Sequence, residues 1–189
     1  MKIAEIFSSL QGEGLSSGYP TTFVRLAGCN LSCSYCDTPA GRQGGDVMDV
    51  EEVAGRVLAE KPLRVCITGG EPLLQKDGVI ELSRQLIRAG KRVSIETNGT
   101  IPFHDIPGDV QICMDVKCPS SGESSDITLL STLKPTDSVK FVVSTDEDLR
   151  FTEKIIQANP TKAEIFISPV YGTSYRHVAD YILSRNLPA

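Results

Sequence analysis

Short apolar runs rich in β-branched residues alternate along this chain with longer segments of helical pattern. The apolar runs predict strands at residues 22–26, 64–68, 92–97, 110–116, 139–143 and 163–168. The longer segments predict helices at residues 49–60, 78–89, 146–158 and 175–184. Strands that alternate with helices of about ten residues or more are typical of parallel βαβ units, so we expect an α/β protein.

The length of the chain limits the architecture further. It has 189 residues, which is enough to bury a core without disulfide bonds. A complete eight-fold (β/α) barrel usually needs about 250 residues. We therefore expect a reduced, incomplete parallel (β/α) barrel, or an open sheet, of about six βα units, formed by one domain over residues 1–189.

Polar and glycine-rich segments follow the predicted strands at the points where the strands end. They are Gly28-Cys29, Thr68-Gly69-Gly70-Glu71-Pro72, Glu96-Thr97-Asn98-Gly99, Asp115-Val116-Lys117-Cys118-Pro119 and Ser168-Pro169-Val170. Parallel α/β folds bind ligands at the carboxyl ends of their strands. One edge of the sheet is therefore expected to carry the functional site.

Three cysteines follow the first predicted strand with the spacing C-x3-C-x2-C: Cys29, Cys33 and Cys36. Thiolates suit zinc and iron–sulfur clusters, but a structural zinc site takes four ligands, and His104 and His177 are distant in the sequence. A 4Fe–4S cluster held by three thiolates has one iron without a protein ligand. That iron could chelate S-adenosylmethionine, whose reductive cleavage gives an adenosyl radical.

Other interpretations of the cysteines stay open at this point. The three could be reduced thiols in a turn, or a zinc site completed by Cys66, Cys113 or Cys118. Cys66 and Cys113 alternate with apolar neighbours inside predicted strands, which favours buried structural thiols. The role of Cys118 is undecided.

Composition and charge limit the partners and the cellular compartment that we expect for this protein. The net charge is −5, which argues against general binding to nucleic acid polyphosphate. Lys2 and Glu5 interrupt the N-terminus before an apolar stretch develops, so we expect no signal peptide, and no apolar run approaches the roughly 18 residues of a membrane span. We expect a cytoplasmic protein whose six cysteines are ligands or buried thiols.

The cysteine run, with Tyr35 before its last member, resembles the signature of the radical S-adenosylmethionine superfamily. Gly69-Gly70-Glu71-Pro72 resembles the second motif of that superfamily, whose backbone runs along the methionyl group of the cofactor. Glycine permits such a close approach. Taken alone, this segment would equally be a plain turn.

A narrower resemblance covers nearly the whole chain. Residues 5–14, 22–29, 36–38, 68–72, 96–99 and 115–120 are similar to the 7-carboxy-7-deazaguanine synthase family. This resemblance implies a radical, magnesium-dependent ring contraction of 6-carboxytetrahydropterin to 7-carboxy-7-deazaguanine, with loss of ammonia, on the way to queuosine-type nucleosides. It also implies a homodimer and an electron donor such as flavodoxin or ferredoxin.

The resemblance assigns six residues to the substrate: Leu10, Gln11, Gly12, Glu13, Arg25 and Thr68. The donor and acceptor edges of the Gln11 amide suit a pterin ring. The guanidinium of Arg25 suits a carboxylate in bidentate geometry. The alternatives are a tight turn around Glu13 and a structural salt bridge from Arg25 to Glu5 or Glu96.

The resemblance assigns nine residues to S-adenosylmethionine: Tyr35, Asp37, Gly70, Glu71, Glu96, Asn98, Asp115, Lys117 and Ser168. The alternatives are a capped Asn98-Gly99 turn, a solvated Asp115–Lys117 ion pair, and a Ser168 that only closes the last strand.

The resemblance places Thr38 on magnesium, which keeps few protein ligands. The alternative is a cap or turn before Pro39. A glycyl-radical activase, or a non-catalytic iron–sulfur or zinc module, would share the three cysteines without needing Gln11, Arg25 and Thr38.

Overall fold

The computed structural model describes residues 1–42 and 44–189. The strands in these residues are β1 (Lys2–Leu10), β2 (Pro20–Leu26), β3 (Asp46–Val47), β4 (Arg64–Gly69), β5 (Arg92–Thr97), β6 (Gln111–Val116), β7 (Ser138–Val143) and β8 (Glu164–Pro169). The α-helices are α1 (Val50–Ala59), α2 (Lys76–Arg88), α3 (Asp146–Ala158) and α4 (Tyr175–Arg185). Each predicted strand and helix is present, with ends shifted by two residues at most.

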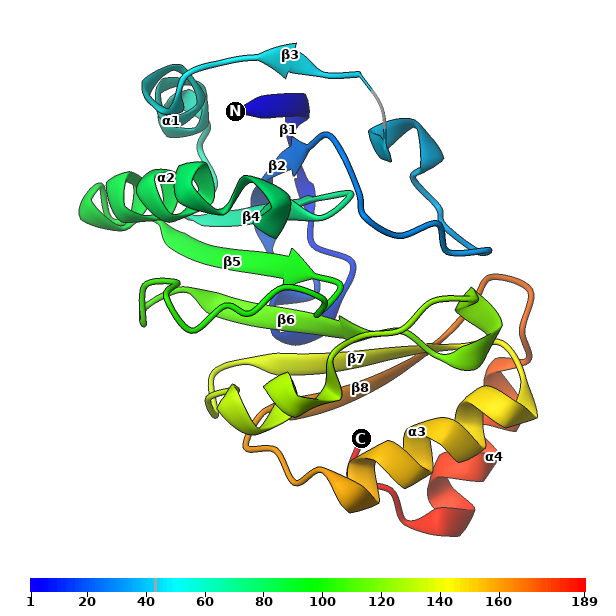
Figure 1. Cartoon of the computed structure of the whole chain (residues 1–189). Helices are drawn as coiled ribbons and strands as arrows, with labels where there is room; N and C mark the ends of the chain where they lie inside the picture. Colours follow the sequence, from blue (N-terminus) through cyan, green and yellow to red (C-terminus); the bar gives the residue numbers. More distant parts are fainter. Residues whose placement is uncertain (43) are drawn as a thin grey trace. The chain divides into compact units, whose positions relative to one another are not determined.

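The strands have the order β3-β1-β2-β4-β5-β6-β7-β8 (Figure 1). β2 pairs with β4, β4 with β5, and β7 with β8, all in parallel. β1 is antiparallel to both β2 and β3. The predicted α/β class is thus confirmed as an open, mostly parallel sheet.

Two strands and two connections depart from the expected regular pattern. β1 and β3 were not predicted, because Lys2, Glu5, Ser8 and Ser9 interrupt the apolar sequence of β1, and only Ile3 in β1 is buried. Within the described residues, no α-helix connects β5 to β6 or β6 to β7. Both connections contain proline and glycine, and the connection from β6 to β7 forms the short 3-10 turns η4 (Pro119–Ser121) and η5 (Ile127–Thr132).

The chain forms two compact units. The first comprises Met1–Asn30, Asp37–Thr97 and Phe103–Cys113, and the second comprises Leu31–Cys36, Asn98–Pro102 and Met114–Ala189. Whether residues 1–189 act as one domain stays a prediction.

In the first unit, helices α1 and α2 lie side by side near β4 and β5 (Figure 1). Asp49 caps α1, because its carboxylate accepts from the Glu52 N–H at 2.7 Å. The face of α2 that carries Val79, Leu82 and Leu86 is fully buried. Gly90 follows this helix with a φ of 83°, the left-handed conformation that ends helices.

In the second unit, helices α3 and α4 lie beside β7 and β8 (Figure 1). A capping box of Thr145 and Asp148 begins α3. The Tyr181 hydroxyl of α4 donates to the Glu153 carboxylate of α3 at 2.7 Å. The two helices therefore share polar contacts.

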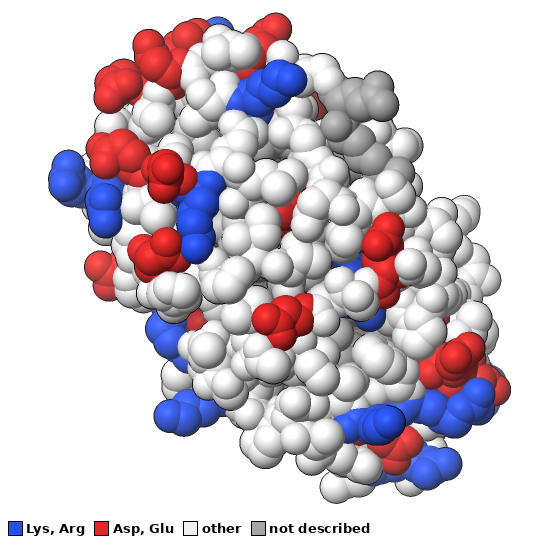
Figure 2. Space-filling model, viewed as in Figure 1, with Lys and Arg blue, Asp and Glu red and all other residues white. Residues whose placement is uncertain are grey.

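Acidic and basic side chains are interspersed on the face shown in Figure 2. None of the helices in the described ranges is both long enough and apolar enough to cross a membrane.

Candidate functional site

Three polar side chains of the first unit form a connected cluster at strand ends. The Gln11 amide donates to Glu96 Oε1 at 3.2 Å, and the Thr68 hydroxyl donates to Glu96 Oε2 at 2.9 Å. Gln11 and Thr68 are buried, and Glu96 is half-buried. Each carboxylate oxygen of Glu96 therefore accepts one hydrogen bond from a residue that was predicted to bind substrate, although Glu96 itself was predicted to bind the cofactor.

The loop after β1 folds back on Gln11. The Gln11 N–H donates to the Tyr19 carbonyl at 2.9 Å, and the Gly18 N–H donates to the Gln11 carbonyl at 2.7 Å. The Glu13 N–H donates to the Gln11 side-chain oxygen at 3.3 Å. Leu10, Gly12 and Glu13 are exposed around this buried amide, so the loop of residues 11–19 closes on Gln11.

Arg25, on β2, forms the salt bridge that the sequence left as an alternative. Its Nε donates to Glu5 Oε1 at 2.7 Å, and the guanidinium carbon lies 5.9 Å from the centre of the Phe7 ring. The arginine side chain is only 20% exposed, so its charge sits in a mainly covered position. These contacts fix the stem and the Nε of Arg25, and its role in substrate binding stays a prediction.

The turn after β4 passes closely against the end of β2. The Glu71 N–H donates to the Gly28 carbonyl at 2.8 Å. A Cβ atom placed on Gly70 would lie 2.8 Å from the Cys29 Cβ and 2.6 Å from the Gly28 carbonyl carbon. Glycine is therefore required here by contact with the chain itself, in addition to the expected approach of a cofactor.

Glu71 is completely buried inside this turn. Its Oε1 accepts from the Leu73 N–H and from the Thr97 hydroxyl, each at 2.9 Å. The carboxylate thus joins the end of β4 to the end of β5, so a residue that was predicted to bind the cofactor also has a structural role.

The three predicted cluster ligands are thiols, each partly exposed. Cys29 belongs to the first unit, and Cys33 and Cys36 belong to the second. In the parts of the chain that the structure describes, no three His, Cys, Asp or Glu side chains are grouped so that they could hold a metal ion. The donor set nevertheless fits an iron–sulfur cluster, since accessible thiols are its ligands and binding often completes such sites.

Tyr35 lies on the loop between Cys33 and Cys36. Its hydroxyl donates to the Val142 carbonyl on β7 at 3.3 Å. Burial, together with the nearby Asp115 carboxylate, raises the pKa of the Tyr35 phenol, which stays protonated. The phenol therefore holds the loop against β7 as a neutral donor.

Asp115 and Lys117 at the end of β6 form an ion pair of 2.7 Å, with side chains 19% and 13% exposed. Lys140 Nζ lies 3.8 Å from the same carboxylate oxygen. Burial opposes the charge of Lys117, but the Asp115 carboxylate outweighs it and raises the pKa of that ammonium. Among the described residues, Asp115 Oδ1 is buried without a hydrogen-bond partner, so the pair is not the solvated surface pair considered as an alternative.

Lys140 was not predicted as a site residue. The available signal was a lysine inside the apolar strand Ser138–Val143, because a buried cation needs a charged partner. The same reasoning singled out Arg25 on β2.

The remaining predicted residues make local contacts. Asn98 Oδ1 accepts from the Thr100 N–H at 3.0 Å and its hydroxyl at 2.6 Å, which is the capped turn considered as an alternative. The Thr38 hydroxyl donates to the Asp37 carboxylate at 2.9 Å, so two oxygen ligands of the kind magnesium prefers are adjacent. Ser168 is half-buried in β8 opposite Val142.

The other cysteines differ in burial. Cys66 is fully buried, as predicted, whereas Cys113 is only half-buried. Cys118 is also buried, and burial raises the pKa of its thiol to about 12. Its sulfur lies 3.7 Å from the Thr152 hydroxyl, so Cys118 packs as a neutral thiol in the second unit.

Known proteins share both the sequence and the fold of this chain. Residues 23–115 match the family model of the radical SAM superfamily. The 7-carboxy-7-deazaguanine synthase of Methanospirillum hungatei is 75% identical over 189 residues, which cover 100% of this chain and 81% of that protein. The 7-carboxy-7-deazaguanine synthase of Koribacter versatilis is 37% identical over 186 residues, which cover 95% of this chain and 82% of that protein.

A solved structure supports the fold independently. The crystal structure of QueE from Escherichia coli matches with a TM-score of 0.80 at 23% identity, covering 98% of this chain and 90% of that chain. At that identity the match shows the fold.

Proposed function

Because this chain belongs to the 7-carboxy-7-deazaguanine synthase family of the radical SAM superfamily, we propose that it converts 6-carboxytetrahydropterin to 7-carboxy-7-deazaguanine. The reaction contracts a ring and releases ammonia, so the enzyme is a carbon–nitrogen lyase of queuosine-type biosynthesis. Its family uses a 4Fe–4S cluster, S-adenosylmethionine and magnesium.

The observation that carries the substrate assignment is the cluster of Gln11, Thr68 and Glu96. A pterin presents a ring N–H beside an exocyclic amino group, and these two parallel donors match the two oxygens of a carboxylate. Glu96 is the carboxylate of this cluster, at 2.9 Å from the Thr68 hydroxyl. We therefore assign Glu96 to the substrate instead of the cofactor.

Arg25 supplies the complementary charge for the substrate carboxylate. Glu5 binds its Nε, so the two terminal nitrogens are the groups that can form a planar fork toward an acid. A non-catalytic module or an activase of a protein substrate has no use for this combination of a pterin-matching carboxylate and a held arginine.

Cys29, Cys33 and Cys36 would hold the cluster, and Thr38 with Asp37 would supply oxygen to magnesium. When bound, the cluster and S-adenosylmethionine supply radical hydrogen abstraction. Tyr35, Asp37, Gly70, Glu71, Asn98, Asp115, Lys117 and Ser168 are proposed around the cofactor. Of these, Lys117 and Asp115 form a covered ion pair in which, among the described residues, Asp115 Oδ1 is buried without a hydrogen-bond partner.

The proposal also covers the cellular compartment, the oligomeric state and the partners of the enzyme. We place the enzyme in the cytoplasm, where its six cysteines stay reduced. We expect a homodimer in which residues 1–189 act as one domain, a small electron-transfer protein such as flavodoxin or ferredoxin as reductant, and no nucleic acid partner.

The test is an anaerobic assay. The full chain is reconstituted with iron and sulfide, then mixed with reductant, magnesium, S-adenosylmethionine and 6-carboxytetrahydropterin, and the product is measured by mass spectrometry. We expect 7-carboxy-7-deazaguanine from the wild type and none from Cys33→Ala. Formation of 5′-deoxyadenosine without this product would overturn the substrate assignment.

Glu96→Gln tests the pterin contact separately. It replaces one acceptor oxygen by a donor, so we expect KM for the pterin to rise by about tenfold or more while iron content is unchanged. Glu60→Gln is the matched control, because Glu60 accepts from the exposed Ser8 hydroxyl at 2.7 Å and is outside the cluster of Gln11, Thr68 and Glu96. An unchanged KM in Glu96→Gln would overturn the assignment of Glu96 to the substrate and favour its earlier assignment to the cofactor.

A further inference from the structure

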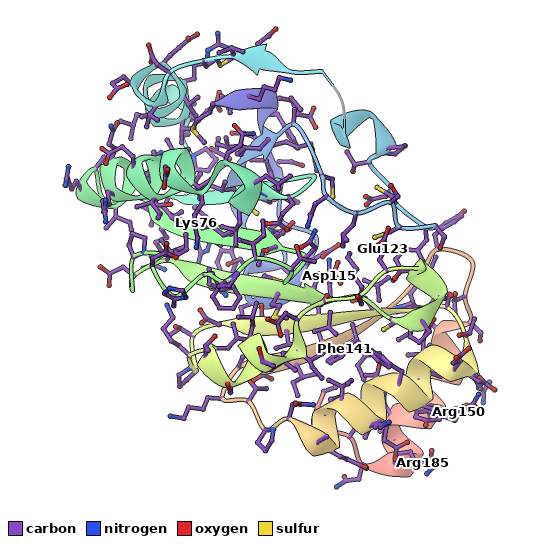
Figure 3. The ribbon with its side chains drawn as sticks, in the orientation of Figure 1. Lys76, Asp115, Glu123, Phe141, Arg150 and Arg185 are labelled. Carbon is purple, nitrogen blue, oxygen red and sulfur yellow. The ribbon has the colours of Figure 1, made fainter. Side chains whose placement is uncertain are left out.

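The loop that carries Cys33 and Cys36 is held by a second segment of the same unit. The Ser34 hydroxyl donates to the Ser120 carbonyl at 2.6 Å, and the Ser34 N–H donates to the Ser121 carbonyl at 3.0 Å. The Ser32 N–H donates to Glu123 Oε1 at 2.6 Å. Figure 3 labels Glu123 beside this loop. The Leu31–Cys36 loop thus depends on residues 120–123 for its position.

Ser120 in this segment is in turn held by one buried carboxylate, that of Asp148. Asp148 Oδ1 accepts from the Ser120 N–H at 2.9 Å, and Oδ2 accepts from the Ser120 hydroxyl at 2.6 Å. Asp148 is 0% exposed. Both polar groups of Ser120 that can donate therefore point to the same side chain, while its carbonyl points to Ser34.

Asp148 makes more contacts than a helix start requires. In a capping box the acidic residue reaches back to the N-cap N–H, and Asp148 does so with Thr145 at 3.1 Å. It also accepts from the Ser144 N–H at 2.8 Å. The two additional bonds to Ser120 have no part in capping α3, and they connect this helix to the cysteine loop.

We propose that Asp148 is a positioning residue for the iron–sulfur cluster, acting through Ser120 on Ser34. The inference rests on the assignment of the cluster to Cys29, Cys33 and Cys36. A cluster with three protein ligands has one fewer bond to the chain than a fully ligated one, so the fixed geometry of its loop contributes more to retention. Partners that orient metal ligands from outside commonly change metal affinity by about 10–100-fold.

The test measures retention of iron by the full chain reconstituted anaerobically, as the rate of iron release to a chelator, with the EPR spectrum of the reduced cluster recorded alongside. Ser34→Ala removes only an exposed hydroxyl, so folding is preserved, and we expect release about fivefold faster than in the wild type. Asp148→Asn replaces an acceptor by a donor facing Ser120, and we expect release faster by about tenfold or more.

Two variants separate this effect from general loss of structure. Ser131→Ala is the matched control, because Ser131 is an exposed serine whose hydroxyl donates to a backbone carbonyl of the same unit, that of Thr128 at 2.9 Å. It should release iron at the wild-type rate. Glu123→Gln keeps an acceptor for the Ser32 N–H and should retain iron better than Glu123→Ala.

The outcomes distinguish this inference from the proposed function. Wild-type release rates and spectra in both Ser34→Ala and Asp148→Asn would overturn the positioning role, even if the enzyme forms product. Faster release in both variants, with no product from the wild type, would support the positioning role and overturn the proposed substrate. Equal acceleration by Ser131→Ala would also overturn the positioning role.

Discussion

The hydroxyl of Thr97 donates to the carboxylate of Glu71 at 2.9 Å, and both side chains are buried. Thr97 is the last residue of β5, and Glu71 lies in the turn after β4. The same Oε1 accepts from the Leu73 N–H. The glycine-rich turn is therefore connected to the neighbouring strand end by a side chain that belongs to the core.

This contact should contribute measurably to stability. Thr97→Val keeps the shape of the side chain but removes one donor from a buried carboxylate, so we expect the free energy of unfolding to fall by about 1–3 kcal/mol in urea. Thr97→Ser keeps the hydroxyl and loses a methyl group, with an expected cost of about 1 kcal/mol. An unchanged stability in Thr97→Val would mean that the hydrogen bond itself contributes nothing.

A methyl group at Gly70 should disturb the end of β2. The new Cβ would lie 2.8 Å from the Cys29 Cβ, so Gly70→Ala must displace the backbone before Cys33 and Cys36. We expect lower iron content per chain after reconstitution and a loss of stability of about 1–3 kcal/mol.

Gly55→Ala provides the comparison for Gly70→Ala. Gly55 lies inside α1, and a Cβ atom placed on it would meet no neighbouring atom within 4 Å. Alanine should stabilise this helix by about 0.5–1 kcal/mol and leave the iron content unchanged. If Gly70→Ala behaved like Gly55→Ala, the close passage of the turn against β2 would not matter.

The fold was predictable from the sequence where local signals agreed. The pattern of β5 follows from buried Val93 and Ile95 alternating with more polar neighbours, and the start of α3 follows from Thr145 with Asp148. β1 escaped prediction because an antiparallel strand with Ile3 as its single buried residue has no apolar pattern to detect. Its assignment depends on pairing with β2, which is a tertiary property.

The sequence predicted candidate residues for the site, but it did not predict the contacts between them. Glu96 follows an apolar run like the other candidates, and nothing in the sequence indicates that its two oxygens meet Gln11 and Thr68, residues 85 and 28 positions away. The connection from Asp148 to Ser34 was likewise absent from the prediction, because the local sequence around Asp148 indicates only a capping residue. Long-range hydrogen bonds of this kind arise from the packing of elements and leave no local pattern.

Arg25→Lys should weaken substrate binding while the cluster forms normally. Lysine keeps the charge but loses the planar fork and the contact of the guanidinium with Phe7. We expect KM for 6-carboxytetrahydropterin to rise by about tenfold or more, with unchanged iron content. Arg56→Lys is the control, since Arg56 forms an exposed pair with Glu52 at 2.7 Å. An unchanged KM in Arg25→Lys would mean that Arg25 does not bind the substrate and has only the structural role of its salt bridge to Glu5.

The charge of Asp148 should make stability depend on pH. Burial disfavours the carboxylate, but hydrogen bonds from Ser120, Ser144 and Thr145 outweigh burial and lower the pKa of Asp148 below its ordinary value. A carboxyl group whose pKa is lower in the folded state stabilises the fold above the unfolded pKa of about 3.9, and this contribution disappears as the pH falls through the folded value.

The comparison of wild type and Asp148→Asn across this range isolates the charge of that one carboxylate. We expect the wild type to be more stable at about pH 7, and the difference in free energy of unfolding to shrink as the pH falls toward about 2. Asp180→Asn, at an exposed position of α4 paired with Arg176 at 3.9 Å, should change stability little at either pH. A difference between wild type and Asp148→Asn that stays constant, or grows on acidification, would show that Ser120, Ser144 and Thr145 do not bind Asp148 as an ionised acceptor. The cysteine loop would then depend on the shape of this side chain alone, and Asp148→Asn should retain iron as the wild type does.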